Sequence, residues 1–237
     1  MDQSPSASLD FDRFEVLTFD TYGTLIDWET GLSHAFGRVL AAHDLVVADD
    51  VVLERFAVHE TAAEAGPYRR YRDVLAAALR GVCGELGTEP TAAEADAFAG
   101  SVADWPPFPD SAAALARLRE RFRLGVITNC DDDLFAASSR RLGVAFDWIV
   151  TAEQARSYKP SERNFELALE RIGLPRDRVL HVAQSLFHDH VPARRLGLST
   201  VWIDRRRDRS GHGATPPAEA RPSATFADLA TFADAAT

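Results

Sequence analysis

Groups suited to nucleophilic and proton-transfer chemistry occur at a few points of the sequence, each at or just after the end of a short apolar run. Two carboxylates, several hydroxyls and two amides are found there: Asp20, Tyr22 and Thr24 after residues 14–19; Thr128 and Asn129 at the end of 124–128; Gln184, Ser185 and Asp189 after 179–183. Lys159, the only lysine of the 237 residues, lies in a further loop. If the runs are strands of one parallel sheet, these side chains meet beyond its carboxyl edge, where open sheets place their sites.

The elements that must position these residues alternate between strands and helices after residue 110. Apolar runs at 124–128, 148–151, 179–183 and 200–203 predict strands, and helical patterns that often stop at a glycine separate them. Together with the run at 14–19 they predict an α/β fold, a Rossmann-like parallel sheet with helices on both faces. The last predicted strand is 200–203, and the Gly-, Pro- and Ala-rich segment 210–222 is expected to be a loop.

A different pattern occupies the segment between the first strand and the second. Apolar residues recur at helical spacing in about four stretches, and Thr91 and Glu94 form a capping-box pattern at the start of the last stretch. Three prolines within Trp105–Pro109 then prevent a helix from continuing. We therefore predict two domains, a core made of residues 1–26 and 105–237, and an inserted helical-bundle cap made of residues 27–104.

Composition and charge exclude several classes of function. The chain has 26 Lys and Arg against 36 Asp and Glu, a net charge of −10, so no nucleic-acid partner is expected. The basic run Arg205–Arg207 is flanked by acidic residues, and the longer run Arg205–Arg209 is expected on a solvated surface. No apolar stretch is long enough to cross a membrane, and Met1–Asp10, expected to be an unstructured leader, lacks the segments of a signal peptide. We expect a cytoplasmic protein with no membrane partner. The spacing of His181, His188 and His190 does not predict a metal cluster.

Four segments of the chain resemble the motifs of the haloacid dehalogenase superfamily. Phe19-Asp-Thr-Tyr-Gly-Thr-Leu25 resembles its nucleophile loop, and Ile127-Thr-Asn129 its second motif. Lys159-Pro160 resembles the third motif, and the segment Val182–His190 the fourth. The segments occur in the order of the family, with a helical insertion after the first, and the resemblance covers residues 14–203.

Within this superfamily the chain is more similar to the type II L-2-haloacid dehalogenases than to the phosphatases. Phosphatases carry a second aspartate two positions after the nucleophile, where this chain has Tyr22. They also carry an acidic Mg²⁺ ligand at the start of the fourth motif, where this chain has Gln184. A hard cation prefers anionic oxygens. The resemblance therefore implies a site without metal or cofactor, in which Lys159 is the charge partner of Asp20.

The resemblance also implies a role for each residue. Asp20 displaces halide from carbon 2 of a short 2-haloalkanoic acid, a small carboxylate, and forms an aspartyl ester. Asp189 helps water to attack this ester, Lys159 keeps Asp20 ionised, and Thr24 and Ser185 hydrogen-bond around the carboxylates. The residues expected to bind the substrate are Tyr22, Thr128, Asn129 and Gln184.

Two alternatives stay open at this point. The first is a Mg²⁺-dependent phosphatase that acts on a small phosphate monoester, which Tyr22 and Gln184 disfavour. The second is a non-catalytic binding protein on the same fold, which the presence of Asp20, Lys159 and Asp189 disfavours.

One expected residue is missing from its aligned position. The dehalogenases place an arginine early in the cap to hold the leaving halide, but Phe56–Glu60 contains none. Arg69, Arg70 and Arg72 are the candidates to replace it. The family resemblance further suggests a homodimer.

Overall fold

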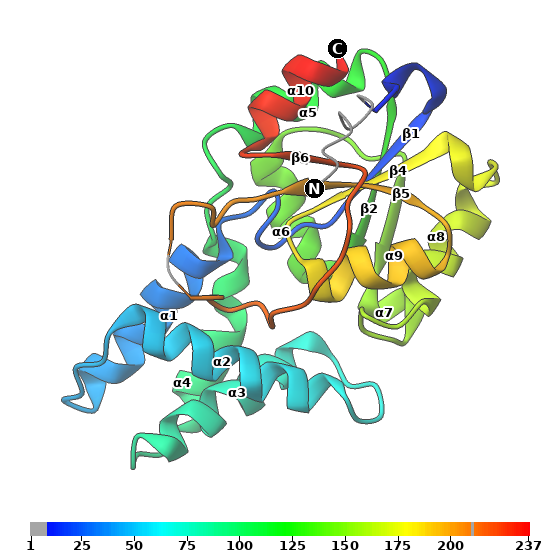
Figure 1. Cartoon of the computed structure of the whole chain (residues 1–237). Helices are drawn as coiled ribbons and strands as arrows, with labels where there is room; N and C mark the ends of the chain where they lie inside the picture. The colour runs from blue at the N-terminus through cyan, green and yellow to red at the C-terminus, as the bar shows by residue number, and fades with distance from the viewer. Residues whose placement is uncertain (1–8, 210) are drawn as a thin grey trace, which may run out of the picture.

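The computed structural model describes residues 9–209 and 211–237, so residues 1–8 of the predicted leader and Ser210 of the predicted loop lie outside the described part. Within these ranges, no helix is long and apolar enough to cross a membrane. A six-stranded sheet has every neighbouring pair of strands parallel, in the order β3-β2-β1-β4-β5-β6 (Figure 1). The predicted parallel sheet is confirmed. Its strands are β1 (Val16–Phe19), β2 (Arg123–Thr128), β3 (Trp148–Thr151), β4 (Val179–Ala183), β5 (Ser199–Ile203) and β6 (Ala224–Phe226).

Helices cover both faces of the sheet because successive side chains of a strand point to opposite faces. In β1, Leu17 and Phe19 belong to an apolar cluster with side chains of α5 and α10, whereas Val16 belongs to a second cluster with α8 and α9. All four residues of β1 are buried, as is typical of a parallel sheet covered on both faces. The helices are α5 (Ser111–Arg119), α6 (Asp132–Leu142), α7 (Ala152–Ala155), α8 (Arg163–Ile172), α9 (Val191–Arg195) and α10 (Leu229–Ala236).

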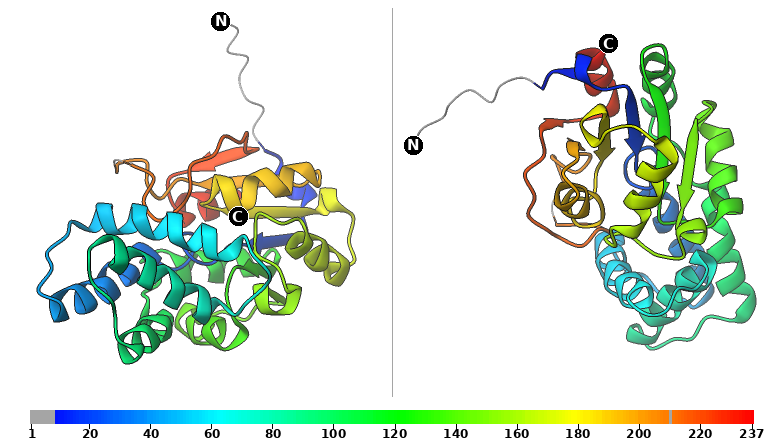
Figure 2. Two further views of the ribbon diagram at one scale, coloured as in Figure 1. Left: turned by 90° about the horizontal axis from the view of Figure 1, so that it is seen from below. Right: turned by 90° about the vertical axis from the view of Figure 1, so that its right-hand side faces the viewer.

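Four further helices occupy the segment predicted as an insertion. They lie together beyond one end of the sheet, and the right-hand view of Figure 2 shows them below the strands. The predicted capping box is present, since Thr91 and Glu94 each bond the other's backbone N–H. Apolar side chains of these helices continue the cluster on one face of the sheet. The helices are α1 (Trp28–Ala42), α2 (Asp49–Glu64), α3 (Tyr71–Glu85) and α4 (Ala92–Gly100).

The carboxyl-terminal part of the fold differs from the prediction. The sheet does not end at residue 203, because β6 pairs in parallel with β5 after the loop. Helix α10 then packs beside α5 (Figure 1). Strand β6 has only three residues and lies at the sheet edge, so it is too short for an alternating pattern to reveal it. The helix predicted to end at Leu196 begins as a π-helical turn, Leu186–His190, and continues as α9.

The basic run before this loop is not a solvated surface, and that prediction is wrong for two of its residues. Arg205 forms an ion pair with Asp110 at 2.9 Å and donates to the carbonyl oxygen of Thr24 at 3.0 Å. Arg206 forms an ion pair with the buried Glu29. The segment after β5 therefore contacts the loop that follows β1.

Candidate active site

The loop after β1 presents Asp20 at the carboxyl edge of the sheet. The Asp20 backbone N–H donates to the carbonyl oxygen of Val182, which extends the pairing of β1 with β4 by one residue. Gly23 allows the loop to turn, because its φ is +91° and an added Cβ would lie 3.1 Å from side-chain atoms of both Gln184 and Trp28. The turn returns Thr24 toward Asp20.

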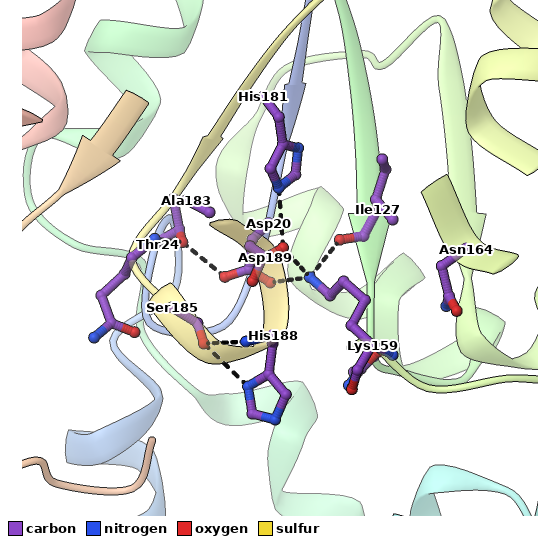
Figure 3. Close-up of polar contacts among 12 residues, drawn as sticks. Asp20, Thr24, Ile127, Lys159, Asn164, His181, Ala183, Ser185, His188 and Asp189 are labelled. Atoms are coloured by element: carbon purple, nitrogen blue, oxygen red, sulfur yellow. Dashed lines mark hydrogen bonds and ion pairs between the residues drawn. The ribbon is translucent and has the colours of Figure 1, made fainter. Parts of the chain in front are cut away.

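Lys159 joins the two carboxylates that the sequence predicts to be catalytic. Its Nζ lies 2.8 Å from Oδ1 of Asp20 and 2.7 Å from Oδ1 of Asp189, and it also donates to the carbonyl oxygen of Ile127 at 2.9 Å (Figure 3). The Lys159 side chain is 1% exposed. All three donor positions of the ammonium are thus used inside the protein.

Thr24 holds the second oxygen of the nucleophile. Its hydroxyl donates to Oδ2 of Asp20 at 2.7 Å and accepts from the backbone N–H of Gln184 at 2.9 Å. Because the hydroxyl hydrogen is directed at Asp20, the accepting lone pair faces the start of the fourth motif. Thr24 therefore ties the nucleophile loop to the end of β4.

Asp189 is held from the opposite side by a histidine of β4. His181 Nε2 lies 2.9 Å from Oδ1 of Asp189, and its Nδ1 lies 2.9 Å from the Thr18 hydroxyl. A carboxylate only accepts, so Nε2 carries the hydrogen. Oδ1 of Asp189 thus receives two hydrogen bonds, from Lys159 and His181, whereas its buried Oδ2 has no hydrogen-bond partner among the described residues.

The pKa values of the two carboxylates beside Lys159 shift in opposite directions. Burial alone would raise the pKa of Asp189, but Lys159 and the His181 hydrogen bond outweigh it and hold that pKa well below its ordinary value. Burial raises the pKa of Asp20, and Lys159 and Thr24 oppose the rise. The two carboxylates raise the pKa of Lys159 against the effect of burial, so the lysine is a cation at neutral pH.

Asn129 positions Lys159 through its backbone. The Asn129 side chain accepts from the Lys159 N–H at 2.7 Å and donates to the Lys159 carbonyl oxygen at 3.0 Å. This pair of bonds fixes the loop after β3 against the end of β2. Asn129 also lines the pocket around Asp20.

The other predicted site residues are distributed around this centre. Tyr22 lines the pocket, but its hydroxyl lies 3.1 Å from the Ser138 hydroxyl in the core. Ser185 also lines the pocket, yet its hydroxyl bonds His188, through the backbone N–H at 2.9 Å and Nδ1 at 3.1 Å, instead of a carboxylate (Figure 3). Burial lowers the pKa of His188 to about 4, so this imidazole is neutral.

Two predicted substrate-binding residues lie outside the pocket that contains Asp20. Thr128 is fully buried and its hydroxyl has no hydrogen-bond partner within residues 9–209 and 211–237. The Gln184 side chain accepts from the Thr215 hydroxyl at 3.3 Å. The structure therefore brings together Asp20, Lys159, Asp189, Thr24, Asn129, Tyr22 and Ser185, and places the side chains of Thr128 and Gln184 apart from them.

The inserted helices form one wall of the pocket that contains Asp20. Four residues of this wall were not among the predicted site residues. They are Trp28 on α1, Glu60 and Glu64 on α2, and Tyr71 on α3. Thr215, from the loop before β6, and His188 complete the lining with residues of the core.

The two glutamates had a signal in the sequence. They continue the apolar stripe of α2 at intervals of one helical turn after Phe56, and a carboxylate on such a stripe is either paired or functional. Tyr71 donates to Oε1 of Glu60 at 2.6 Å. Burial raises the pKa of Glu60 to about 7, and burial together with Glu60 raises that of Glu64 well above its ordinary value.

None of the three arginines proposed for the halide lines this pocket. Arg70 forms an ion pair with Asp133 at 3.1 Å, and Arg72 pairs with the same carboxylate at 2.8 Å. The side chain of Arg69 is exposed, and its backbone carbonyl oxygen accepts from the Tyr158 hydroxyl at 2.9 Å. In the described part of the chain, no arginine lines the wall opposite Asp20.

The donor set does not fit a divalent metal ion. Both oxygens of Asp20 are engaged, by Lys159 and Thr24, and the side chain of Gln184 is turned toward Thr215. Among the described residues, no group of three or more His, Cys, Asp and Glu side chains is arranged to hold a metal.

Comparisons with known proteins agree with the family that the four sequence motifs indicate. The family model of the haloacid dehalogenase-like hydrolases matches residues 14–186. An (S)-2-haloacid dehalogenase of Pseudomonas fluorescens is 26% identical over 216 residues, which cover 90% of this chain and 92% of that protein. A pyrimidine 5'-nucleotidase of Escherichia coli is 30% identical over 125 residues, which cover 51% and 56% of the two chains. The crystal structure of a defluorinating L-2-haloacid dehalogenase superimposes with a TM-score of 0.79 at 22% identity, over 98% of both chains, and so shares the fold.

Proposed function

The chain belongs to the haloacid dehalogenase-like hydrolases, and we propose that it hydrolyses short 2-haloalkanoic acids through an ester on Asp20, without a metal ion. The observation that carries this proposal is the buried ammonium of Lys159, within 2.8 Å of Asp20 and 2.7 Å of Asp189. It supplies beside the nucleophile the positive charge that a metal would otherwise supply. The (S)-2-haloacid dehalogenase of Pseudomonas fluorescens, similar over 90% of this chain, supports the choice of substrate class.

The first half of the proposed reaction is a displacement at carbon 2. An oxygen of Asp20 attacks this carbon, and the carbon–halogen bond breaks so that halide leaves with the electron pair. Lys159 and Thr24 fix the carboxylate before the attack, and the pocket wall of α1–α3 limits its contact with bulk water. The product of this step is an ester between Asp20 and the alkanoic acid.

The second half is hydrolysis of that ester. Water attacks the Asp20 carboxyl carbon, and the bond to the alkanoic acid oxygen breaks to release a 2-hydroxy acid. The free Oδ2 of Asp189 can accept a hydrogen of this water, while Lys159 and His181 hold Oδ1. Tyr22 and Asn129, which line the pocket beside Asp20, are the proposed contacts of the substrate carboxylate. The homodimer and the cytoplasmic location stay predictions.

The competing candidate is a Mg²⁺-dependent phosphatase, which the pyrimidine 5'-nucleotidase among the similar proteins brings into consideration. The geometry disfavours it, because Tyr22 and Gln184 provide no anionic oxygen where the phosphatases hold the metal. A single panel of assays separates the two candidates.

The panel measures halide release from chloroacetate and from each enantiomer of 2-chloropropionate, and phosphate release from p-nitrophenyl phosphate. Each assay is run with and without a chelator. We expect halide release that chelation does not change, from one enantiomer of 2-chloropropionate only, and none from Asp20→Asn. Phosphate release that depends on added Mg²⁺, without halide release, would overturn the proposal.

A single turnover in ¹⁸O-water tests the ester. Because water attacks the Asp20 carboxyl carbon, one solvent oxygen remains on the Asp20 side chain and appears in its peptide by mass spectrometry. Label found only in the released product would contradict the ester and indicate direct attack of water on carbon 2.

A further inference from the structure

The wall of the pocket that faces the nucleophile carries acids. The core contributes Asp20 and Lys159, and the helices α1–α3 contribute the other side, with Glu60 and Glu64. In a displacement, the leaving atom departs on the side of the carbon opposite the attacking oxygen. A group displaced by Asp20 therefore moves toward the wall that holds the two glutamates.

Among the described residues, this wall offers a departing halide no arginine, and its carboxyl groups suit a leaving atom that takes up a proton. A departing halide is an anion that takes up no proton, and a cation is its favourable neighbour. Arg70 and Arg72 are directed to Asp133 instead. A leaving oxygen, by contrast, departs as an alkoxide and requires a proton donor, which a carboxylic acid provides.

We propose that Glu64 donates a proton to the leaving atom, and that the site thereby also opens the three-membered cyclic ether of an oxirane-2-carboxylate. The inference rests on the proposed attack by Asp20. An oxirane-2-carboxylate carries its leaving oxygen on carbon 2, beside a carboxylate, as a 2-haloalkanoic acid carries its halogen. Ring strain makes this carbon reactive toward a carboxylate nucleophile, which an unstrained ether would resist.

The surroundings of Glu64 favour its acid form. The groups near Glu64 include Glu60, on the same helix, and the phenols of Tyr71 and Tyr158, none of which carries a positive charge. Among the described residues that act on Glu64, Lys159 is the one cation, and it lowers the pKa of Glu64. Glu60 already accepts from Tyr71, and the Glu64 oxygens lie 3.5 Å from the Asn129 amide nitrogen. Burial and the proximity of Glu60 raise the pKa of Glu64, which favours the protonated form that a proton donor needs.

The step balances without any further reactant. An oxygen of Asp20 forms a bond to carbon 2, the carbon–oxygen bond of the ring breaks, and the ring oxygen takes the proton of Glu64. Water then hydrolyses the ester, and the proton released when Asp20 returns to its carboxylate form restores Glu64 through solvent. The net reaction adds one water and yields 2,3-dihydroxypropanoate.

A second observation independently indicates a ligand at this site. Asp189 is 0% exposed, lines the same pocket, and its Oδ2 has no hydrogen-bond partner in the described part of the chain. A buried carboxylate oxygen without a donor is costly unless a bound group supplies one. The water of the hydrolytic half-reaction is such a donor, and both substrate classes need it.

The experiment compares oxirane-2-carboxylate with 2-chloropropionate on wild type, Asp20→Asn, Glu64→Gln and a control, Glu170→Gln, whose exposed side chain lies on α8. Diol formation and chloride release are measured across pH, and circular dichroism checks the fold. We expect wild type and the control to form the diol and Asp20→Asn to form none. In Glu64→Gln the ratio of diol formation to chloride release should fall by about 100-fold or more. The wild-type rate of diol formation should decline as pH rises through the pKa of Glu64, and this decline should be absent from the variant.

The outcomes separate this inference from the proposed function. Chloride release without any diol overturns the oxirane activity and leaves the haloacid reaction standing. If Glu64→Gln forms the diol as fast as wild type, the role of Glu64 as proton donor is overturned. Diol without chloride supports the inference and contradicts the haloacid reaction, and wild type inert toward both acids overturns both proposals.

Discussion

Replacing Lys159 by methionine should destabilise the folded protein and disable its nucleophile. The substitution keeps most of the side-chain volume and removes the ammonium that lies within 2.8 Å of Asp20 and 2.7 Å of Asp189. Two buried carboxylates are then left without a cation. Removing one partner of a buried ion pair typically costs about 3–5 kcal/mol.

The same energy predicts how the effect depends on pH. At 1.36 kcal/mol for each pKa unit, it corresponds to a rise of roughly two to four units shared between the two carboxyls. The folded-state pKa of Asp20 then rises further above its unfolded value, and that of Asp189 loses most of its lowering, so the penalty is complete at neutral pH and shrinks as pH falls through these values. In wild type the lowered pKa of Asp189 adds stability above its ordinary pKa, which is lost as pH falls through the folded value. The difference between the two proteins should therefore be largest near neutral pH.

Urea unfolding followed by circular dichroism measures this difference, at about pH 7 and about pH 4.5. We expect a loss of about 3–5 kcal/mol at the higher pH and a smaller loss at the lower, with a fall in kcat of roughly 100-fold. Arg163→Met, an exposed cation on α8, is the control. The double variant Lys159→Met/Asp189→Asn removes one uncompensated charge and should recover part of the stability. A loss below about 1 kcal/mol at neutral pH, or one equal at both pH values, would refute the reasoning.

Three further substitutions test other contacts of the site. Thr24→Val removes the hydrogen bond to Oδ2 of Asp20. Because an unmade hydrogen bond to a buried carboxylate costs about 1–3 kcal/mol, kcat should fall by about 10-fold or more. A kcat equal to that of wild type would contradict this. Asp189→Asn should release one equivalent of halide in a burst and then stop with the ester intact, whereas steady turnover would show that another group activates the water. Arg205→Met removes the ion pair to Asp110 and should lower the free energy of unfolding by about 1–3 kcal/mol in urea titrations, a loss that a solvated arginine would not produce.

The sequence predicts the site best where a polar, reactive residue directly follows a buried strand. The apolar run before Asp20 becomes β1, of which every residue is buried, and the predicted neighbours Lys159 and Asp189 meet Asp20 in space. A buried parallel strand is mostly apolar, so its end is visible where a polar segment such as the one that begins at Asp20 follows it. Parallel pairing then brings such ends to one edge without any further information.

The cap wall of the pocket could not be predicted in the same way. The helical pattern identifies α2 and its apolar stripe, but it does not tell whether Glu60 and Glu64 at the end of the stripe face solvent, an ion-pair partner or a cavity. Tertiary packing of α2 against α3 decides this, through the bond from Tyr71. The three-residue strand β6 depends likewise on its neighbour β5, because it has too little pattern of its own.

The central position of β1 has a consequence for how the protein is made. Thr18 contacts His181 across 163 residues, and Asp20 contacts Lys159 across 139. During synthesis the helices α1–α4, which contact their neighbours along the chain, can form early, while β1 waits for β2 and β4 to emerge from the ribosome. A nascent chain therefore carries Asp20 through the synthesis of the next 139 residues without the lysine that activates it.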